Sequence, residues 1–215
     1  MTERTAFGIL HTNWYVRMKT QTVDSPTKER LLDAALGLML AKGFSATTVD
    51  EICGRAKLTK GSFFHYFESK DQIGEVLLER FCCRAEALHA ACVGSETDPL
   101  ARVYNYIDGL IKLAGDPAME RGCLLGMFAQ ELSREQPKIR GVCAKGFEGW
   151  EKHFGKELAQ AKRVYAPKAG FDPRSVAQHL IAVLEGALIL AKVKGNAAPV
   201  TSSLKHFRRY VESLF

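Results

Sequence analysis

Two short helical segments lie on either side of a three-residue turn, Lys57-Leu58-Thr59, and this arrangement limits the fold more than any other feature of the sequence. The first segment begins with Thr48-Val-Asp-Glu51, a capping box in which the threonine and the glutamate each satisfy a backbone N–H at the helix start. The second, Lys60–Phe67, concentrates three phenylalanines, a tyrosine and a histidine. Because Phe63 and Phe67 are four residues apart, we expect them to share the inner face and anchor the second helix against the first.

Helix signals continue along the rest of the chain. Ser69-Lys-Asp-Gln72 is a second capping box and opens a long helix, and residues 121–134 and 139–163 also have helical patterns. Three capping residues precede a proline, which a first helical turn tolerates, at Ser25-Pro26, Asp98-Pro99 and Asp172-Pro173. Strand-like alternation is poor throughout. The sequence therefore predicts an all-α protein.

Composition narrows the class of protein. The chain has 215 residues, 47% of them hydrophobic, and a formal net charge of +6, so we expect a globular protein with a polyanionic partner such as nucleic acid. Six scattered cysteines form no CxxC motif, and the histidines form no cluster at metal-ligand spacing, so we expect neither a metal site nor a cofactor. No apolar run approaches the roughly 18 residues of a membrane span. We expect a reduced, cytoplasmic protein without a membrane partner.

The N-terminal residues carry no helical period and no pattern of a secretory signal. We therefore expect residues 1–25 to form a flexible arm. Met18 is a candidate for the true start of the protein, because every patterned segment follows it.

A pair of helices joined by three residues is the helix-turn-helix arrangement, whose second helix can enter the major groove of DNA. The residues from Cys53 to Lys70 include four basic side chains and one acidic one, so this stretch can neutralise phosphates. Lys60, Ser62 and His65 are placed for base edges, and Thr48 and Lys70 for phosphates. The alternative is an aromatic helical hairpin used only for packing.

Residues 27–80 resemble the DNA-binding region of the TetR family of transcriptional regulators. The matching segments are Arg30-Leu-Leu-Asp-Ala-Ala35, Lys42-Gly-Phe44, Thr47-Thr-Val-Asp-Glu-Ile52, Arg55-Ala56, Leu58-Thr-Lys-Gly-Ser-Phe-Phe-His-Tyr-Phe67 and Ser69-Lys-Asp71. The resemblance implies that DNA is contacted by Thr48, Lys60, Ser62, Phe64, His65, Tyr66 and Lys70. Tyr66 and Lys70 would meet phosphates. Phe64 stands where the family more often has tyrosine, so one hydroxyl is missing.

The segment Leu180–Ala191 has one charged residue, Glu185, and a helix that is apolar on nearly every side must be buried all round. TetR-like proteins pair as homodimers through their last two long helices, which the resemblance extends to this chain. We expect the interface to include Leu184, Gly186, Ala187 and Leu188. The alternative is a central core helix of a monomer.

The remaining sequence suggests a place for a small-molecule effector. Its candidate lining residues are Tyr104, Cys123, Met127, Phe128, Phe147 and Trp150, a mainly apolar set with a few polar groups. Each of them could equally be ordinary core. Some relatives sense oxidants or electrophiles through cysteine, and Arg121 could lower the pKa of the Cys123 thiol. A buried structural role is the alternative for that cysteine.

Together these observations predict residues 26–70 as a three-helix DNA-binding head with a helix-turn-helix, and residues 71–215 as a larger helical domain for ligand binding and dimerisation. The expected protein is a homodimeric repressor that a small molecule releases from its double-stranded DNA operator. Two alternatives remain, a cysteine-based redox or electrophile sensor and a helical protein-interaction module without sequence-specific DNA binding. No GxSxG motif or Gly-rich phosphate loop is present, so we do not expect an enzyme.

Overall fold

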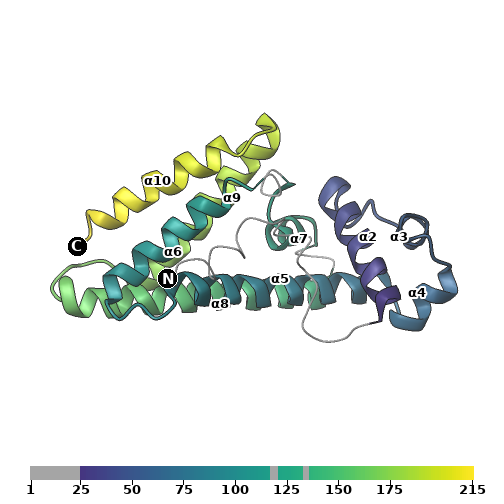
Figure 1. Ribbon diagram of the computed structural model, residues 1–215, viewed down its shortest axis with the longest axis horizontal. Helices are drawn as coiled ribbons and strands as arrows, with labels where there is room; N and C mark the ends of the chain where they lie inside the picture. The colour runs from purple at the N-terminus through teal and green to yellow at the C-terminus, as the bar shows by residue number, and fades with distance from the viewer. Residues whose placement is uncertain (1–24, 117–120, 133–135) are drawn as a thin grey trace, which may run out of the picture. The chain divides into compact units, whose positions relative to one another are not determined.

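A computed structural model describes residues 25–116, 121–132 and 136–215, and over these residues the chain is helical without a strand, as predicted (Figure 1). The expected arm at residues 1–25, with Met18, lies outside the described residues apart from Ser25. The helices are α2 (Pro26–Lys42), α3 (Val49–Ala56), α4 (Lys60–Tyr66), α5 (Lys70–Val93), α6 (Pro99–Leu113), α7 (Leu124–Leu132), α8 (Pro137–Tyr165), α9 (Pro173–Lys194) and α10 (Ala198–Glu212).

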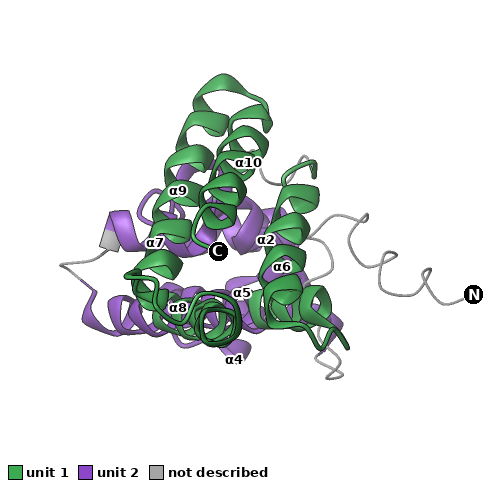
Figure 2. Ribbon diagram, turned by 90° about the vertical axis from the view of Figure 1, so that its left-hand side faces the viewer, with its two compact units in different colours: residues 1–14, 84–122, 147–215 green, residues 15–83, 123–146 purple. Residues whose placement is uncertain are grey.

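The chain divides into two compact units, which Figure 2 shows in separate colours. The first, here called the head unit, contains the described residues up to Cys83 and the described parts of residues 123–146. The second, the body unit, contains the described parts of residues 84–122 and 147–215. This division differs from the expected boundary after residue 70. The start of α5, all of α7 and the start of α8 belong with the helix-turn-helix.

Packing explains why these later segments join the head unit. The Phe128 ring of α7 packs against the Phe44 ring of the α2–α3 loop, with centroids 5.1 Å apart. Ile73 and Leu77 of α5 are fully buried with the α2 side chains. Burying an aliphatic or aromatic side chain stabilises a fold by about 1.5–3 kcal/mol, so three short helices gain a core by recruiting longer ones. The buried set includes Leu31, Leu32, Ala35, Met39, Leu40, Ile52, Phe63 and Phe67.

Most of the predicted helix starts form as expected. Asp98 accepts a hydrogen bond from the Ala101 N–H at 2.7 Å, and Asp172 accepts from the N–H groups of Arg174 and Ser175. Ser25 is different, because its hydroxyl makes no cap and instead bonds the Tyr66 hydroxyl.

The second predicted capping box forms only in part. The Ser69 hydroxyl accepts from the Gln72 N–H at 3.2 Å, as the motif requires. The Gln72 side chain, however, accepts from the N–H of Glu68 at 2.6 Å, one residue before the cap. Residues 121–123 also differ from the prediction, since α7 begins only at Leu124. Gly122 has a φ of +90°, which a right-handed helix does not allow.

The body unit has its own core around Tyr106, Phe154 and Phe207, whose rings form a contiguous chain of contacts. Arg102 of α6 donates to the Glu157 carboxylate of α8 at 2.6 Å, with both side chains largely buried. α9 packs mainly against α10, and α10 also packs against α6. These three helices therefore fix the C-terminal part of the chain.

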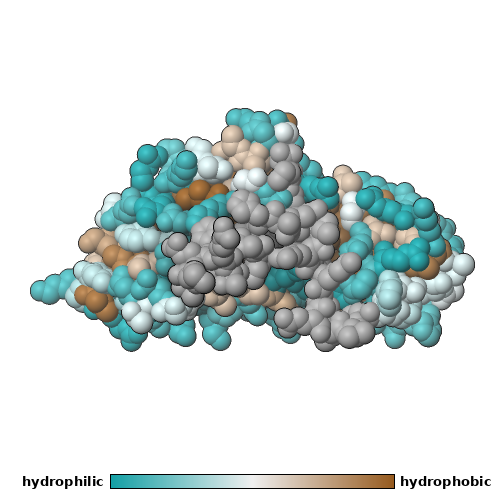
Figure 3. All heavy atoms as spheres, in the orientation of Figure 1, coloured by the Kyte–Doolittle hydropathy of each residue, from teal (hydrophilic) through white to brown (hydrophobic). Residues whose placement is uncertain are grey.

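α9 is long and apolar enough, by composition alone, to pass a test for a membrane-spanning helix. Its side chains at Leu180, Leu184, Ala187, Leu188 and Ala191 are buried in the body unit, which explains that hydrophobicity as one face of a core helix. On the face of the molecule drawn in Figure 3, hydrophobic residues form small separate patches in a mainly hydrophilic surface.

Candidate nucleic-acid interface

The turn between α3 and α4 is fixed by backbone geometry and by a cap. Lys57 adopts a left-handed conformation with φ +52°, and it ends α3. The Leu58 N–H then donates to the Cys53 carbonyl at 2.9 Å. The Thr59 hydroxyl accepts from the Ser62 N–H at 3.1 Å and so starts α4. This confirms the predicted helix-turn-helix, with the turn at the predicted residues.

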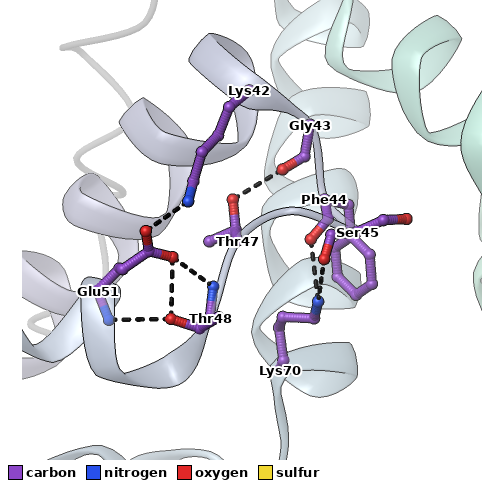
Figure 4. Close-up of polar contacts among 8 residues, drawn as sticks. All are labelled: Lys42, Gly43, Phe44, Ser45, Thr47, Thr48, Glu51 and Lys70. Carbon is purple, nitrogen blue, oxygen red and sulfur yellow. Dashed lines mark hydrogen bonds and ion pairs between the residues drawn. The ribbon is translucent and has the colours of Figure 1, made fainter.

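The start of α3 has the predicted capping box (Figure 4). The Thr48 hydroxyl accepts from the Glu51 N–H at 3.3 Å, and the Glu51 carboxylate accepts from the Thr48 N–H at 2.9 Å. Lys42 at the end of α2 donates to the same carboxylate at 2.5 Å. The hydrogen bond from Lys42, followed by those from Thr48, lowers the pKa of Glu51 to about 2. The carboxylate therefore holds the start of α3 next to the end of α2.

The two faces of α4 have opposite character. Phe63 and the following Phe67 are buried against the head core, as their spacing predicted. Phe64 is 56% exposed, although it is a large apolar side chain, and His65 is exposed beside it. Gly61 is also exposed, and a Cβ there would meet only the Thr59 hydroxyl, at 3.6 Å. The outward face of α4 is thus open to a close-fitting partner.

Several of the predicted contact groups are held by partners in the chain. The Lys60 ammonium pairs with Asp50 at 2.7 Å on the exposed side of the motif. The Tyr66 hydroxyl is 2.8 Å from the Ser25 hydroxyl. Ser62 shares a hydrogen bond with the Thr59 hydroxyl at 3.0 Å. These partners, which are exposed or partly buried, position the side chains at the rim of the α4 face.

Lys70 lies deeper than the other predicted contacts. Its ammonium donates to the Phe44 carbonyl at 2.9 Å and approaches the Phe44 ring at 4.3 Å (Figure 4). Burial lowers the pKa of Lys70. The positive charge therefore stabilises the loop before α3 in addition to any outward role.

Sequence reasoning missed Glu131 of α7, which binds the loop before α3. This α7 carboxylate accepts from the backbone N–H groups of Phe44 at 3.3 Å and Ser45 at 3.0 Å. The N–H groups of Phe44 and Ser45 in the loop thus donate to Glu131, and the carbonyls of the loop accept from Lys70. The one available signal was an acidic residue at the end of an otherwise apolar segment, which does not indicate a partner 86 residues away.

The six predicted effector-lining residues do not belong to one compact unit. Cys123, Met127 and Phe128 lie in the head unit, and Phe128 is a core residue packed on Phe44. The other three, Tyr104, Phe147 and Trp150, lie in the body unit. Their assignment to the effector stays a prediction, with three of the residues in each unit.

The predicted dimer residues also need correction. Leu184, Ala187 and Leu188 are buried in the chain's own core, and of the four only Gly186 is exposed. The helical repeat of 3.6 residues turns a different set of α9 side chains outward. That exposed set is Ala182, Gly186, Ile189, Leu190 and Val193, with Val193 81% exposed.

An open groove of about 550 Å³ lies in the body unit beside the start of α9, bounded by Glu148, Glu151, Lys152, Gly155, Ala159, Asp172, Pro173 and Arg174. Arg174 closes part of it through an ion pair with Glu151 at 3.2 Å. None of the predicted effector residues lines this groove.

Cysteine chemistry gains little support from the described residues. Cys53, Cys123 and Cys143 are buried, Cys82 and Cys92 are partly buried, and Cys83 is exposed. Burial raises the pKa of the Cys92 and Cys143 thiols to about 11, so little thiolate forms at neutral pH. Over the described part of the chain, no group of three histidine, cysteine or carboxylate side chains could hold a metal.

A helix-turn-helix with an exposed second helix, attached to a larger helical body, defines the class of helical DNA-binding regulators. Comparison with known proteins agrees. Residues 31–76 match the family described as "Bacterial regulatory proteins, tetR family", and residues 99–207 match "Tetracyclin repressor-like, C-terminal domain". The chain belongs to the TetR family of transcriptional regulators.

Similar proteins cover most of the chain. The HTH-type transcriptional repressor DhaR of Mycobacterium sp. is 29% identical over 84% of this chain and 89% of its own length. The transcriptional regulator AcuR of Cereibacter sphaeroides is 29% identical over 85% of this chain and 84% of its own length. The crystal structure of the regulatory protein TetR from Rhodobacter sphaeroides has 28% identity and a TM-score of 0.73, covering 86% of this chain and 99% of that one.

Proposed function

We propose that this protein is a homodimeric, cytoplasmic repressor that binds a palindromic DNA operator through α4 and leaves it when a small molecule binds in the body unit. The observation that carries the proposal is the open outward face of α4, where Phe64 and His65 are exposed beside Gly61. Exposure of a large apolar side chain on a short, rigidly capped helix is explained if that helix enters the major groove.

The exposed side chains divide into two roles. Lys60, Ser62 and His65 can bond base edges, and Phe64 can contact the methyl group of thymine. Thr48, Tyr66 and Lys70 border this face and are assigned to phosphates. Lys60 would exchange its exposed ion pair with Asp50 for DNA, an exchange that costs little because exposed ion pairs contribute at most about 1 kcal/mol.

The dimer is assigned to the exposed face of α9. Ile189 and Leu190 are each 51% exposed, and Val193 is exposed further. At Gly186 a Cβ would meet nothing within 4 Å, so a second helix could approach closely there. A two-fold pair supplies two recognition helices for two half-sites about one DNA turn apart. A second copy of this chain is therefore the occupant that the DNA-binding role requires.

The repressor role is proposed from similar proteins, and release by an effector is proposed from thermodynamic linkage between two binding sites. Two similar proteins, DhaR and the NemR protein of Escherichia coli, are named transcriptional repressors. An effector releases DNA only if it prefers one of two states of the protein, and the coupling is reciprocal. Binding of a small molecule in the body unit is favoured over a cysteine switch at Cys123, because that thiol is buried.

The test is fluorescence anisotropy on DNA from upstream of the protein's own gene, compared with a scrambled duplex at several salt concentrations. We expect much tighter binding to the native sequence, and Lys60→Ala should weaken that preference because it removes a base-edge contact. Phe64→Ala should reduce the preference for the native duplex. Arg163→Ala, an exposed cation at the end of α8, is the matched control.

Equal binding to the native, scrambled and selected random duplexes would contradict the proposal. It would leave a helical interaction module whose basic face binds any polyanion.

A further inference from the structure

An exposed ion pair joins the starts of the two helices of the helix-turn-helix. The Asp50 carboxylate lies in the first turn of α3 and accepts from the Lys60 ammonium, at the first position of α4, at 2.7 Å. Both side chains are mostly open to solvent, with Asp50 67% and Lys60 63% exposed. Thr48 caps the start of α3 and Thr59 caps the start of α4, so the backbone of both residues is held in place. The motif therefore presents a donor and an acceptor side by side.

The carboxylate works against the binding of Lys60 to a phosphate. Lysine binds phosphates by neutralising their charge, and a carboxylate beside the ammonium reduces that attraction. Asp50 is not needed as a cap, because Thr48 and Glu51 already form the capping box of α3. If Lys60 turned to a phosphate, Asp50 would lose its partner close to a second negative charge. The pair thus favours a DNA group that offers an acceptor to Lys60 and a donor to Asp50.

A G·C base pair offers these groups in the major groove. Guanine presents the acceptors O6 and N7, and its paired cytosine presents the N4–H₂ donor. A base-pair hydrogen bond joins O6 and N4, so they lie about 2.9 Å apart. That separation is close to the 2.7 Å between the polar atoms of Lys60 and Asp50. An adenine beside Lys60 would instead turn a donor toward the ammonium, and a thymine would offer a single acceptor beside its methyl group.

We propose that Asp50 and Lys60 together recognise one G·C pair in each half of the operator. Lys60 donates to O6 and N7 of the guanine, and Asp50 accepts from N4 of the paired cytosine. This inference rests on the proposed function, because it names the base pair that the helix-turn-helix selects. Asp50 is then a specificity-determining residue, which weakens binding to phosphates and strengthens binding to one base pair.

The experiment selects duplexes from random DNA with the full chain and then modifies single bases of the selected site. In N4-methylcytosine, a methyl group replaces the N4 hydrogen in the major groove, and the Watson–Crick pair is retained. At one cytosine of each half-site, this change should weaken binding of the wild-type protein about tenfold, the effect of roughly one hydrogen bond. Asp50→Ala should bind the modified and the unmodified duplex equally.

Two further variants give a readout that a simple change of charge would not give. Asp50→Ala should bind a scrambled duplex about fivefold more tightly, because Lys60 is freed from an exposed ion pair, and should bind the selected site no more tightly. Glu68→Ala removes an exposed carboxylate just beyond α4 and should raise the affinity for both duplexes alike. Replacing the paired guanine by 7-deazaguanine, which lacks N7, should weaken the wild-type protein and leave Lys60→Ala unchanged.

The outcomes separate this inference from the proposed function. Tight binding to the selected site that no N4-methylcytosine weakens would overturn the inference and leave the proposed function standing. That result is obtained with the wild-type protein, so it does not depend on the folding of a variant. Equal changes in Asp50→Ala and Glu68→Ala would show that Asp50 acts only through its charge, and would also overturn the inference. A selection that finds no duplex bound more tightly than the scrambled one would contradict the proposed function itself, and the inference with it.

Discussion

The head unit and the body unit satisfy their polar groups in different ways. In the head unit, the loop before α3 is held by Glu131 on its N–H groups and by Lys70 on its carbonyls. In the body unit, Nε2 of His89 is buried without a hydrogen-bond partner among the described residues, and α9 leaves apolar side chains exposed. A fully bonded scaffold presents one rigid surface, whereas unpaired groups and an exposed apolar face indicate places where a ligand or a second copy completes the fold.

The largest expected effect tests how far the head depends on its aromatic core. Phe63→Ala should lower the free energy of unfolding by about 3–5 kcal/mol, because it leaves a cavity under α4. Phe64→Ala, one residue further, should change it by less than about 0.5 kcal/mol, because that side chain is exposed. Urea denaturation of both variants measures the contrast. Similar losses would mean that both rings belong to the core.

A smaller effect is expected at the loop before α3. Glu131→Ala should cost about 0.5–1.5 kcal/mol, since the N–H groups of Phe44 and Ser45 lose their acceptor at a partly exposed position. Operator affinity should fall with it, because the loop leads into the cap of α3. Glu86→Ala, at an exposed position of α5, serves as the control for removing one acidic residue. Unchanged stability and operator affinity in Glu131→Ala would show that the loop does not need its hydrogen bonds to Glu131.

Gly186→Ala distinguishes a free surface from an interface. On a free helix surface, alanine should stabilise α9 by about 0.5–1 kcal/mol, because nothing lies within 4 Å of the added Cβ. In a closely packed dimer it should instead weaken association, as seen by sedimentation at decreasing protein concentration. Ser202→Ala on α10 is a comparison substitution of similar size at an exposed position. A more stable protein with unchanged association would remove Gly186 from the interface.

The smallest effect is a dependence of head stability on acid. Because the pKa of Glu51 is lowered in the folded protein to about 2, its carboxylate contributes stability above the unfolded-state pKa near 4.5. That contribution is lost as the pH falls from about 4.5 through 2. Glu51→Gln should therefore flatten the acid limb of the stability curve, measured by thermal unfolding between pH 5 and 2. An acid limb of unchanged slope would mean that folding does not lower the pKa of Glu51, so that its bonds to Lys42 and Thr48 add no net stability.

Local sequence predicted what local chemistry decides. The turn at residues 57–59, the caps at Thr48, Asp98 and Asp172, and the inner face of α4 all depend on residues within one or two helical turns. The failures share a cause. At Ser25 and Gln72 the side chain does not make the expected capping bond, because it bonds another group instead. The Ser25 hydroxyl bonds the Tyr66 hydroxyl, and the Gln72 side chain accepts from the N–H of Glu68.

The candidate site was predicted unevenly for the same reason. The exposed residues of α4 follow from helical spacing, whereas the role of Glu131 depends on a contact across 86 residues. The dimer prediction named three side chains that are buried in the chain itself, because an all-round apolar segment does not reveal which face meets its own core.

The sequence by itself determined that the chain is helical, that residues 48–66 form a helix-turn-helix and that the family is one of DNA-binding regulators. Caps, turns and apolar periods depend on interactions over a few residues, so the neighbouring residues in the sequence are enough to predict them. Only the tertiary structure decided that α7 belongs with the head unit, that Lys70 bonds the loop before α3, and that Leu184, Ala187 and Leu188 of α9 face the chain's own core. Those outcomes depend on which distant surfaces exclude water together, and burial is a property of the whole fold.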